Sequence, residues 1–356
     1  MLYVKESSAG PIDLSAQGGG HRAIRLLAMK ILLTGGSGFL GSYVAEQLAS
    51  AGHGVRALVR PRSDKRLLER LPGVEFAHGA IEDRASLDPA VAGVDAVIHV
   101  AGIVKARKPA DFFEVNAQGT RNLLDAALSR GGLRRFVYVS SLAAVGPSLD
   151  GTPVPDDAEP RPVTHYGRSK LEAEREVLSA KDRIPVTVVR PPLIYGPRDR
   201  ETLAFFTSVR NGVLPMTGDG SNTLSVVYAS DCAAAIVQAA TDPNPRSGRT
   251  YFVDDGAVYV WRDALGRIEE ALGKRAFVRF GMPLGVVKVA AAATQLWGRM
   301  SGTAQMLTLD KVNELTQPHW VCSGEGARRE LGWAPRVDWA QGVQEAVKWY
   351  RAEGWL

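Results

Sequence analysis

Short apolar runs alternate with stretches of helical periodicity through the first two thirds of the chain. An alternation of strands and helices favours a parallel sheet, because each strand returns to the next through a right-handed helical crossover. The pattern therefore predicts an α/β fold with a doubly wound parallel sheet. The predicted strands are residues 30–34, 55–59, 74–78, 96–100, 136–140 and 186–190, with a late strand at 251–253.

The alternation stops after Pro191. Prolines and glycines recur in the segment that follows, and helices are predicted again at 231–240 and 261–272. We therefore expect a sheet domain at 29–190, which the late strand completes, and a smaller C-terminal lobe that occupies most of 191–356.

Residues 1–28 follow neither pattern. They combine Pro11 and the triplet Gly18-Gly19-Gly20 with scattered polar residues, and their longest apolar run is Leu26-Leu27-Ala28. A secretory signal needs a continuous apolar core after its positive charges. We therefore expect a flexible N-terminal extension and a cytoplasmic protein.

A glycine-rich turn, Thr34-Gly35-Gly36-Ser37-Gly38-Phe39-Leu40-Gly41, joins the first predicted strand to the first helix. Gly35 can take the positive φ of a tight turn, Gly38 lets the backbone approach a pyrophosphate, and Gly41 lets the helix lie close to the strand. The helix N-terminus then faces the negative charge of the phosphates. The turn therefore predicts a nucleotide cofactor, although a glycine triplet alone also occurs in plain tight connections.

A second candidate site lies in Tyr166-Gly167-Arg168-Ser169-Lys170. Residues four apart share a helix face, so the Lys170 ammonium can lie beside the Tyr166 phenol and favour its phenolate form. Ser141 follows the predicted strand at 136–140. A tyrosine and a lysine at this spacing also occur on amphipathic helices with no catalytic role, so the interpretation depends on the accompanying motifs.

Together these motifs resemble the extended short-chain dehydrogenase/reductase family, also called the NAD-dependent epimerase/dehydratase family. The resemblance runs from about Met29 to the C-terminus. Besides the glycine turn and the Ser141, Tyr166 and Lys170 set, it rests on His99-Val100-Ala101-Gly102, on Asn116 followed by Gly119 and Thr120, and on Arg190-Pro191-Pro192-Leu193-Ile194-Tyr195-Gly196-Pro197.

The resemblance implies a Rossmann doubly wound parallel sheet with a smaller C-terminal substrate-binding lobe, and a hydride transfer. Tyr166 then exchanges a proton with the substrate oxygen, Ser141 hydrogen-bonds the same oxygen, and Lys170 lowers the pKa of Tyr166 and holds the nicotinamide ribose. Asn116, the fourth candidate in the catalytic set, has a structural or proton-relay part.

The resemblance also implies the residues that contact cofactor and substrate. His165 is in addition a candidate second acid, although a pocket wall or a helix start explains it as well. The cofactor-binding set is Gly35, Ser37, Gly38, Phe39, Leu40, Gly41, Arg60, Ala80, Ile81, Val100, Ala101, Gly102, Tyr166, Lys170 and Pro191. The substrate-binding set is Val104, Ser141, Leu142, His165, Pro192, Leu193 and Leu224.

The choice of cofactor depends on the end of the second predicted strand. NAD-preferring folds usually have an acid there, whereas this chain has Arg60, with Arg62 and Lys65 nearby. A guanidinium at this point can pair with a 2′-phosphate and stack on adenine. The sequence favours NADP(H), and NAD(H) stays open if Arg60 only stacks on adenine.

One motif departs from the family. After the third strand the family usually has Gly-Asp, whose carboxylate accepts from the adenine amino group, but this chain has Gly79-Ala80. The contact is either lost or supplied elsewhere, for example by Asp83.

The substrate class follows from two further positions. Sugar-nucleotide members carry an asparagine and an arginine that hold the diphosphate, and this chain has Leu193 and Leu224 at the aligned positions. The segment from Arg190 instead resembles the branch holding 3β-hydroxysteroid dehydrogenases, sterol-4-carboxylate dehydrogenases and dihydroflavonol reductases. Its members act on bulky apolar alcohols or ketones, so we expect a lipophilic small-molecule substrate.

The apolar run at 282–297 has several interpretations. Lys288 and the short length argue against a membrane span, which needs about 20 apolar residues. The run suits a lid over an apolar pocket, an interfacial helix that gives a peripheral membrane contact, or a core or dimer helix. We expect a homodimer.

Composition excludes other classes. The net charge of +5 comes from dispersed residues, with no dense basic run and interleaved aromatics, so nucleic-acid binding is not expected. The two cysteines, Cys232 and Cys322, lie far apart and suggest neither a metal site nor a disulfide framework.

Three functions are compatible with these motifs and this composition. The first is an NADP(H)-dependent oxidoreductase that interconverts a hydroxyl and a ketone on a sterol, another isoprenoid or an aromatic polycycle. The second is a sugar-nucleotide epimerase or dehydratase with tightly bound NAD, against which Leu193 and Leu224 argue. The third, a non-catalytic nucleotide sensor, is disfavoured by the intact Ser141, Tyr166 and Lys170.

Overall fold

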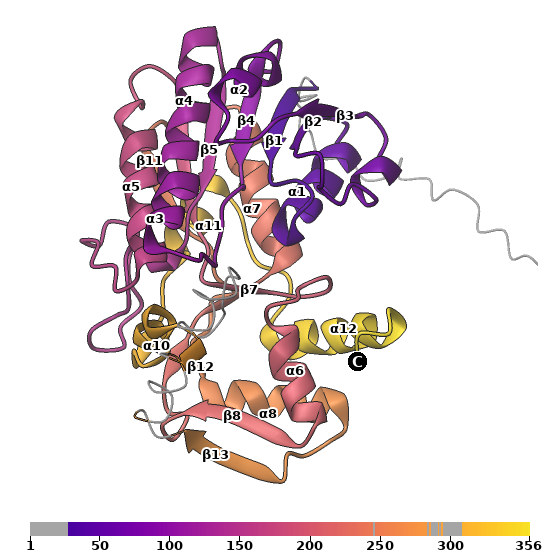
Figure 1. Ribbon diagram of the computed structural model, residues 1–356, viewed down its shortest axis with the longest axis vertical. Helices are drawn as coiled ribbons and strands as arrows, with labels where there is room; N and C mark the ends of the chain where they lie inside the picture. The colour runs from indigo at the N-terminus through magenta and orange to yellow at the C-terminus, as the bar shows by residue number, and fades with distance from the viewer. Residues whose placement is uncertain (1–27, 245, 283–284, 286–290, 292, 295–307) are drawn as a thin grey trace, which may run out of the picture.

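The computed structural model describes residues 28–244, 246–282, 285, 291, 293–294 and 308–356 (Figure 1). Its largest element is a seven-stranded sheet in the order β11-β6-β5-β4-β1-β2-β3, with every neighbouring pair parallel. The strands are β1 (Lys30–Thr34), β2 (Gly54–Val59), β3 (Val74–His78), β4 (Ala96–His99), β5 (Arg135–Val139), β6 (Val186–Arg190) and β11 (Arg249–Phe252). The predicted doubly wound sheet is confirmed, with strand ends shifted by at most two residues.

Helices cover both faces of this sheet, because each strand buries apolar side chains on both sides. One face packs against α1 (Phe39–Ser50), α7 (Ala229–Thr241) and α11 (Glu325–Leu331). The other face packs against α2 (Arg84–Val91), α4 (Gly119–Arg130) and α5 (His165–Ser179). Each helical layer forms a separate hydrophobic core with the face of the sheet that it covers.

A second, smaller part lies beyond the carboxyl ends of the strands, in the lower half of Figure 1. Its core joins apolar and aromatic side chains of several elements, among them Tyr195, Phe206, Trp339 and Tyr350. The elements are β7 (Leu193–Tyr195), α6 (Leu203–Arg210), β8 (Val213–Thr217), β9 (Thr223–Leu224), β10 (Val226–Tyr228), β12 (Tyr259–Val260), α8 (Trp261–Leu272), β13 (Val278–Met282), α10 (Leu309–Leu315), β14 (His319–Trp320) and α12 (Trp339–Ala352).

The chain crosses between the two parts several times. After β7, helix α7 and strand β11 return to the sheet, and α11 returns again after α10. The segment 191–356 is therefore interleaved with the sheet rather than folded as one continuous lobe. Most of the apolar run at 282–297 lies outside the described residues, as do residues 1–27.

The strand order reverses between β1 and β4. In open α/β sheets, ligands bind in the crevice that such a reversal leaves at the carboxyl ends of the strands. Gly35, Val100, Ser140 and Pro191 directly follow β1, β4, β5 and β6 at this edge. The candidate motifs therefore meet at one place, facing the smaller part.

Candidate active site

The glycine turn has the geometry that its sequence predicts. Gly35 has a φ of +72°, and a Cβ there would lie 2.7 Å from the backbone nitrogen of Ala101. A Cβ on Gly41 would overlap the carbonyl oxygen of Gly35, so only glycine lets α1 start this close to the turn. Among the residues that the structure describes, no side chain caps the first turn of α1 at Gly38. Its free N–H groups are therefore available to an anion such as a pyrophosphate.

A buried chain of hydrogen bonds runs from this turn to Asn116. The Thr34 hydroxyl accepts from the Ala101 N–H at 3.2 Å and lies 2.6 Å from Nδ1 of His99. Nε2 of His99 then donates to the Thr120 hydroxyl at 2.9 Å, and Thr120 donates to the Asn116 carbonyl at 2.5 Å. Burial lowers the pKa of His99 to about 3, so this ring is neutral. The chain fixes its tautomer.

Asn116 lies in a π-helical turn, Phe113–Gln118, that leads into α4. Such turns often occur at functional sites, because the wider turn redirects a side chain or a carbonyl. Its amide oxygen accepts from the Ile103 N–H at 2.8 Å, and its nitrogen donates to the Ile103 carbonyl and the Ser169 hydroxyl, each at 3.0 Å. The side chain therefore joins the loop after β4 to the helix that carries Tyr166 and Lys170.

The helix with Tyr166 and Lys170 packs closely on the turn after Ser141. A Cβ on Gly167 would overlap the carbonyl oxygen of Ala143, which lies in the 3-10 turn η3 (Leu142–Ala144). The hydroxyl of Thr164 caps the helix by accepting from the Gly167 N–H at 3.0 Å. This close approach brings the three catalytic candidates to one side of the sheet edge.

Tyr166 is protonated at neutral pH. Burial raises its pKa to about 12, a hydrogen bond with Ser141 opposes the rise, and the negative charge of Glu314 adds to it. Its ring centre lies 6.1 Å from that of Phe112, at a tilt. The pair of Tyr166 and Ser141 therefore presents a phenol held as a proton donor beside an aromatic wall.

Lys170, on the same helix, is buried. Its ammonium donates to the Val139 carbonyl at 2.6 Å and lies 4.4 Å from the centre of the Tyr138 ring. Burial lowers its pKa to about 7, although the nearby Glu174 opposes the shift. The expected lowering of the Tyr166 pKa by Lys170 is therefore not seen here; the lowering comes from Ser141.

A buried ion pair lies one turn beyond Lys170. Arg190, the last residue of β6, donates to both carboxylate oxygens of Glu174, at 2.9 and 2.6 Å. Both side chains are buried, at 6% and 1% exposure. The third nitrogen of the guanidinium donates to the Asp156 carbonyl at 3.1 Å. The pair fixes the position of the catalytic helix on the end of β6.

The other predicted residues lie in different surroundings. Gly102 borders the site, because a Cβ there would lie 3.0 Å from the Asn116 amide oxygen and 3.9 Å from Lys170 Nζ. Arg60 is exposed after β2, and Val104 is 59% exposed. Ile81 is buried against Gly119. Leu142 is buried in a small core cluster, whereas Leu224 and Leu193 belong to the core of the smaller part.

His165 has a structural contact that its sequence did not reveal. Its backbone N–H, the first of α5, donates to both oxygens of Asp310, at 3.1 and 2.9 Å. An acid at a helix N-terminus stabilises the helix dipole. Sequence reasoning missed Asp310 because it lies far away in the chain. It also missed Thr164, although a threonine just before a helix is a recognisable capping signal.

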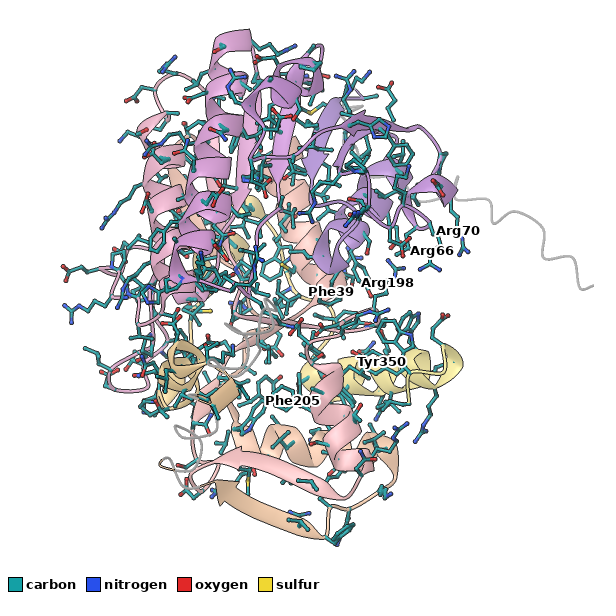
Figure 2. All side chains as sticks on the ribbon, viewed as in Figure 1. Phe39, Arg66, Arg70, Arg198, Phe205 and Tyr350 are labelled. Carbon is teal, nitrogen blue, oxygen red and sulfur yellow. The ribbon has the colours of Figure 1, made fainter. Side chains whose placement is uncertain are left out.

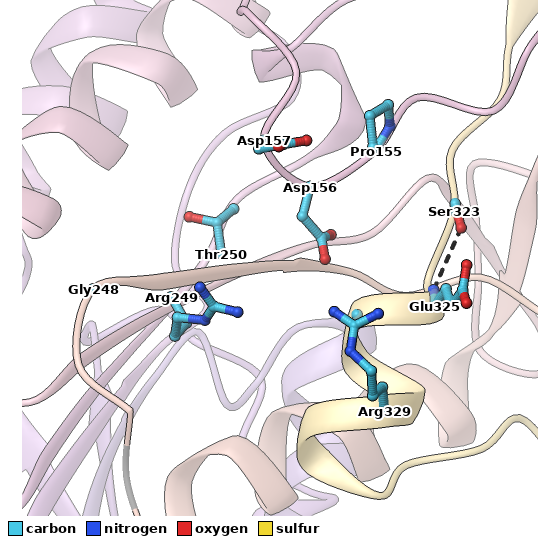
Figure 3. Close-up of a pocket in the computed structure, with 10 residues that line it drawn as sticks. Pro155, Asp156, Asp157, Gly248, Arg249, Thr250, Ser323, Glu325 and Arg329 are labelled. Carbon is cyan, nitrogen blue, oxygen red and sulfur yellow. Dashed lines mark hydrogen bonds between the residues drawn. The ribbon is translucent and has the colours of Figure 1, made fainter.

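A separate cleft of about 430 Å³ lies at the outer edge of the sheet (Figure 3). Asp156 and Asp157 line it from the segment before α5, Arg249 comes from β11, and Arg329 comes from α11. Both arginines donate to Glu330, whose single negative charge offsets only part of their positive charge. The cleft contains none of the catalytic candidates.

Within the described ranges, no group of three or more histidine, cysteine or acidic side chains could hold a metal ion. Cys232 and Cys322 are free and buried. No helix in the described part of the chain is long and apolar enough to cross a membrane.

We predict that Gly167→Ala lowers the free energy of unfolding by about 2 kcal/mol and strongly reduces turnover, because the new methyl group must displace the Ala143 carbonyl. The matched control is Gly266→Ala in α8, where a Cβ meets no atom within 4 Å. That change should stabilise the protein by up to about 1 kcal/mol, since alanine restricts the unfolded chain. Equal urea midpoints for the two variants would contradict the close contact.

We also predict that Lys170 makes stability depend on pH in the cofactor-free protein. Its pKa is about 7 when folded against 10.5 when exposed, so the unfolded chain binds more protons between these values. The free energy of unfolding therefore rises with pH from about 7 to 10, with a slope of at most about 1.4 kcal/mol per pH unit from this group. Urea titrations should show this slope in the wild type and lose it in Lys170→Met. Parallel curves would show that Lys170 stays charged when folded.

The chain is similar to known proteins over most of its length. Residues 31–253 match the model of the NAD dependent epimerase/dehydratase family. The chain is 33% identical over 331 residues to the ceramide reductase of Caulobacter vibrioides, covering 92% of this chain and 96% of the relative. It is 30% identical over 342 residues to the 3 beta-hydroxysteroid dehydrogenase/Delta 5-->4-isomerase of Mycobacterium tuberculosis, covering 90% of each.

A solved structure has the same fold. It is DesIV, a dTDP-glucose 4,6-dehydratase from Streptomyces venezuelae with NAD and TYD bound, at a TM-score of 0.75 and 26% identity, covering 92% of this chain and 98% of the other. The predicted Rossmann fold and the predicted family are confirmed. The chain belongs to the NAD dependent epimerase/dehydratase family and is an NAD(P)-dependent oxidoreductase of that family.

Proposed function

We propose that the protein reduces a ketone on a lipophilic substrate to an alcohol, or runs the reverse oxidation, at the site formed by Ser141, Tyr166 and Lys170. The observation that carries this proposal is the close packing of α5 on the turn after Ser141 at the carboxyl edge of the sheet, which brings Ser141 to the helix of Tyr166, whose pKa burial raises to about 12. A phenol that keeps its proton at neutral pH is suited to donate it to an oxygen that becomes negatively charged.

Each side chain has a defined part in this reaction. The Ser141 hydroxyl hydrogen-bonds the carbonyl oxygen of the substrate, and the Tyr166 phenol gives that oxygen its proton. When bound, the nicotinamide supplies the hydride to the carbonyl carbon. Lys170, one helical turn beyond Tyr166 on the same face of α5, would hold the nicotinamide ribose. Asn116 holds the loop after β4 against helix α5 through its hydrogen bonds to Ile103 and Ser169.

The apolar character of the substrate is supported by the smaller part of the fold. Leu224 is buried in its apolar core and Leu193 packs against that core. These are the positions at which the family resemblance places the asparagine and arginine that hold a diphosphate. Burying a diphosphate without partners costs several kcal/mol. The names of the two relatives, a ceramide reductase and a hydroxysteroid dehydrogenase, denote lipophilic substrates. The likeness to DesIV makes a sugar nucleotide the competing substrate.

We propose NADP(H) as the preferred cofactor. Arg60 lies at the end of β2 with an exposed side chain, and among the described residues its guanidinium makes no ion pair. Its backbone N–H donates to the Ser63 hydroxyl at 3.1 Å, which shapes the turn that carries it. A free guanidinium at this position is available to a 2′-phosphate.

We predict that the purified protein turns over ketosteroids, hydroxysteroids or polycyclic aromatic ketones and rejects UDP- and dTDP-sugars. Transfer of the apolar substrate from water contributes about 25 cal/mol per Å² buried. Calorimetry and nicotinamide absorbance measure binding and turnover for each compound. Tyr166→Phe is the control, which should lose nearly all turnover and keep its cofactor affinity. Micromolar binding or conversion of a sugar nucleotide, with no response to the apolar set, would establish the competing function.

For the cofactor, we predict that Arg60→Asp shifts the ratio of kcat/KM values toward NADH by about ten- to a hundredfold. The substitution removes a charge-assisted contact worth about 1.5 to 3 kcal/mol and repels the 2′-phosphate. Steady-state kinetics with both cofactors measure the ratio, and Arg62→Asp, two residues farther along the same exposed turn, is the matched comparison. A wild type that already prefers NADH contradicts the proposed role of Arg60.

A further inference from the structure

Arg198 has an unusual backbone conformation. Its φ is +73°, and it is the only residue other than glycine with a positive φ among the described residues. A non-glycine residue in this region is strained and persists only where its surroundings hold it. Arg198 directly follows β7 and the pair Gly196-Pro197, in the segment that runs out of the candidate active site.

The side chain of Arg198 reaches across to the helix that starts at the glycine turn. Its guanidinium forms an ion pair with Glu46 at 2.8 Å and donates to the Ser42 hydroxyl at 3.2 Å. It also lies 4.6 Å from the centre of the Tyr43 ring. All three partners belong to α1, and Figure 2 labels Arg198 and Phe39 in this region, where the smaller part meets α1.

The backbone around Arg198 is held from both parts of the fold. From α1, the Tyr43 hydroxyl donates to the Pro197 carbonyl at 2.9 Å. From α12, the Tyr350 hydroxyl lies 3.1 Å from the Gly196 carbonyl and 2.8 Å from the Asp199 carbonyl. These contacts fix the turn on either side of the strained residue. The strain is therefore maintained by the junction between the two parts.

The other end of the same segment contacts the catalytic residues. The Pro191 carbonyl accepts from the Leu142 N–H at 2.9 Å, directly after Ser141. Arg190 pairs with Glu174 on the helix of Tyr166 and Lys170. Residues 190–198 thus form one short strap that joins the catalytic helix, the catalytic serine and the helix of the glycine turn.

We propose that Arg198 is a positioning residue that locks this strap onto α1, so that the substrate-facing residues at 191–193 keep a fixed position relative to the bound dinucleotide. The inference rests on the proposed function only for the identity of the substrate. Arg198 acts through α1 and the strap and touches no reacting atom. Its loss loosens the strap, which raises KM for the ketone more than it changes the cofactor dissociation constant.

Three variants separate the guanidinium from the backbone. Arg198→Ala removes the contacts to α1 and keeps the strained φ, whereas Arg198→Gly removes the contacts and also relieves the strain. Arg200→Ala is the matched control, since Arg200 lies in the same turn but stacks on Trp355, 4.6 Å from its ring centre, away from α1. Amide hydrogen exchange of 39–50 and 191–202 in the NADPH-bound protein reports the strap directly.

The locking role predicts a specific pattern. Arg198→Ala and Arg198→Gly both raise KM for the best ketosteroid by about tenfold, leave the NADPH dissociation constant within about threefold, and speed exchange in both segments. Arg198→Gly also unfolds at a higher temperature than Arg198→Ala. Arg200→Ala behaves as the wild type in KM and exchange.

Two results overturn the proposal. One is a wild-type KM and unchanged exchange in Arg198→Ala. The other is a normal KM in Arg198→Gly with a raised KM in Arg198→Ala, because the backbone rather than the guanidinium then matters. If the wild type reduces no ketone at all, the proposed function fails. The role of Arg198 is then decided by the amide hydrogen exchange rates of 39–50 and 191–202 in the NADPH-bound wild type and variants.

Discussion

The buried ion pair between Arg190 and Glu174 holds the site together. Both charges are out of water, so each depends on the other, and removing one partner leaves an uncompensated charge that costs about 3 to 5 kcal/mol. The pair places the helix of Tyr166 and Lys170 on the end of β6, while the same guanidinium binds the Asp156 carbonyl and lies 5.5 Å from the Phe252 ring. One arginine thus ties together β6, α5, β11 and the segment between Ser141 and Tyr166.

The remaining geometry follows from a few close approaches around that pair. Gly41 lets α1 reach the phosphate-binding turn, and Gly167 lets α5 reach the turn after Ser141. The neutral His99 links β1 to the π-helical turn of Asn116 through buried hydrogen bonds. Burial around these contacts also sets the protonation of the site, because it favours the neutral forms of both Tyr166 and Lys170.

The sequence predicted the sheet well because fully buried parallel strands appear as continuous apolar runs between turn residues. The glycine turn and the Tyr166 and Lys170 spacing were also visible, since their geometry is local. The contact of Asp310 with the N–H of His165 was not, because it joins residues that only tertiary structure brings together. For the same reason the interleaving of α7 with the sheet and the positive φ of Arg198 had no signal in the local pattern. Roles in the site stay predictions, as does the preference for NADP(H).

In the proposed reaction, hydride moves from a nicotinamide to a lipophilic ketone while Tyr166 supplies the proton. The most direct measurement incubates the full chain with a ketosteroid and NADPH deuterated at both C4 positions, and records the product by mass spectrometry. We expect the wild type to form an alcohol that carries one deuterium, and Tyr166→Phe to form almost no alcohol. An unlabelled ketone recovered in full, beside conversion of a dTDP-sugar whose own hydrogen returns to the product, would contradict it.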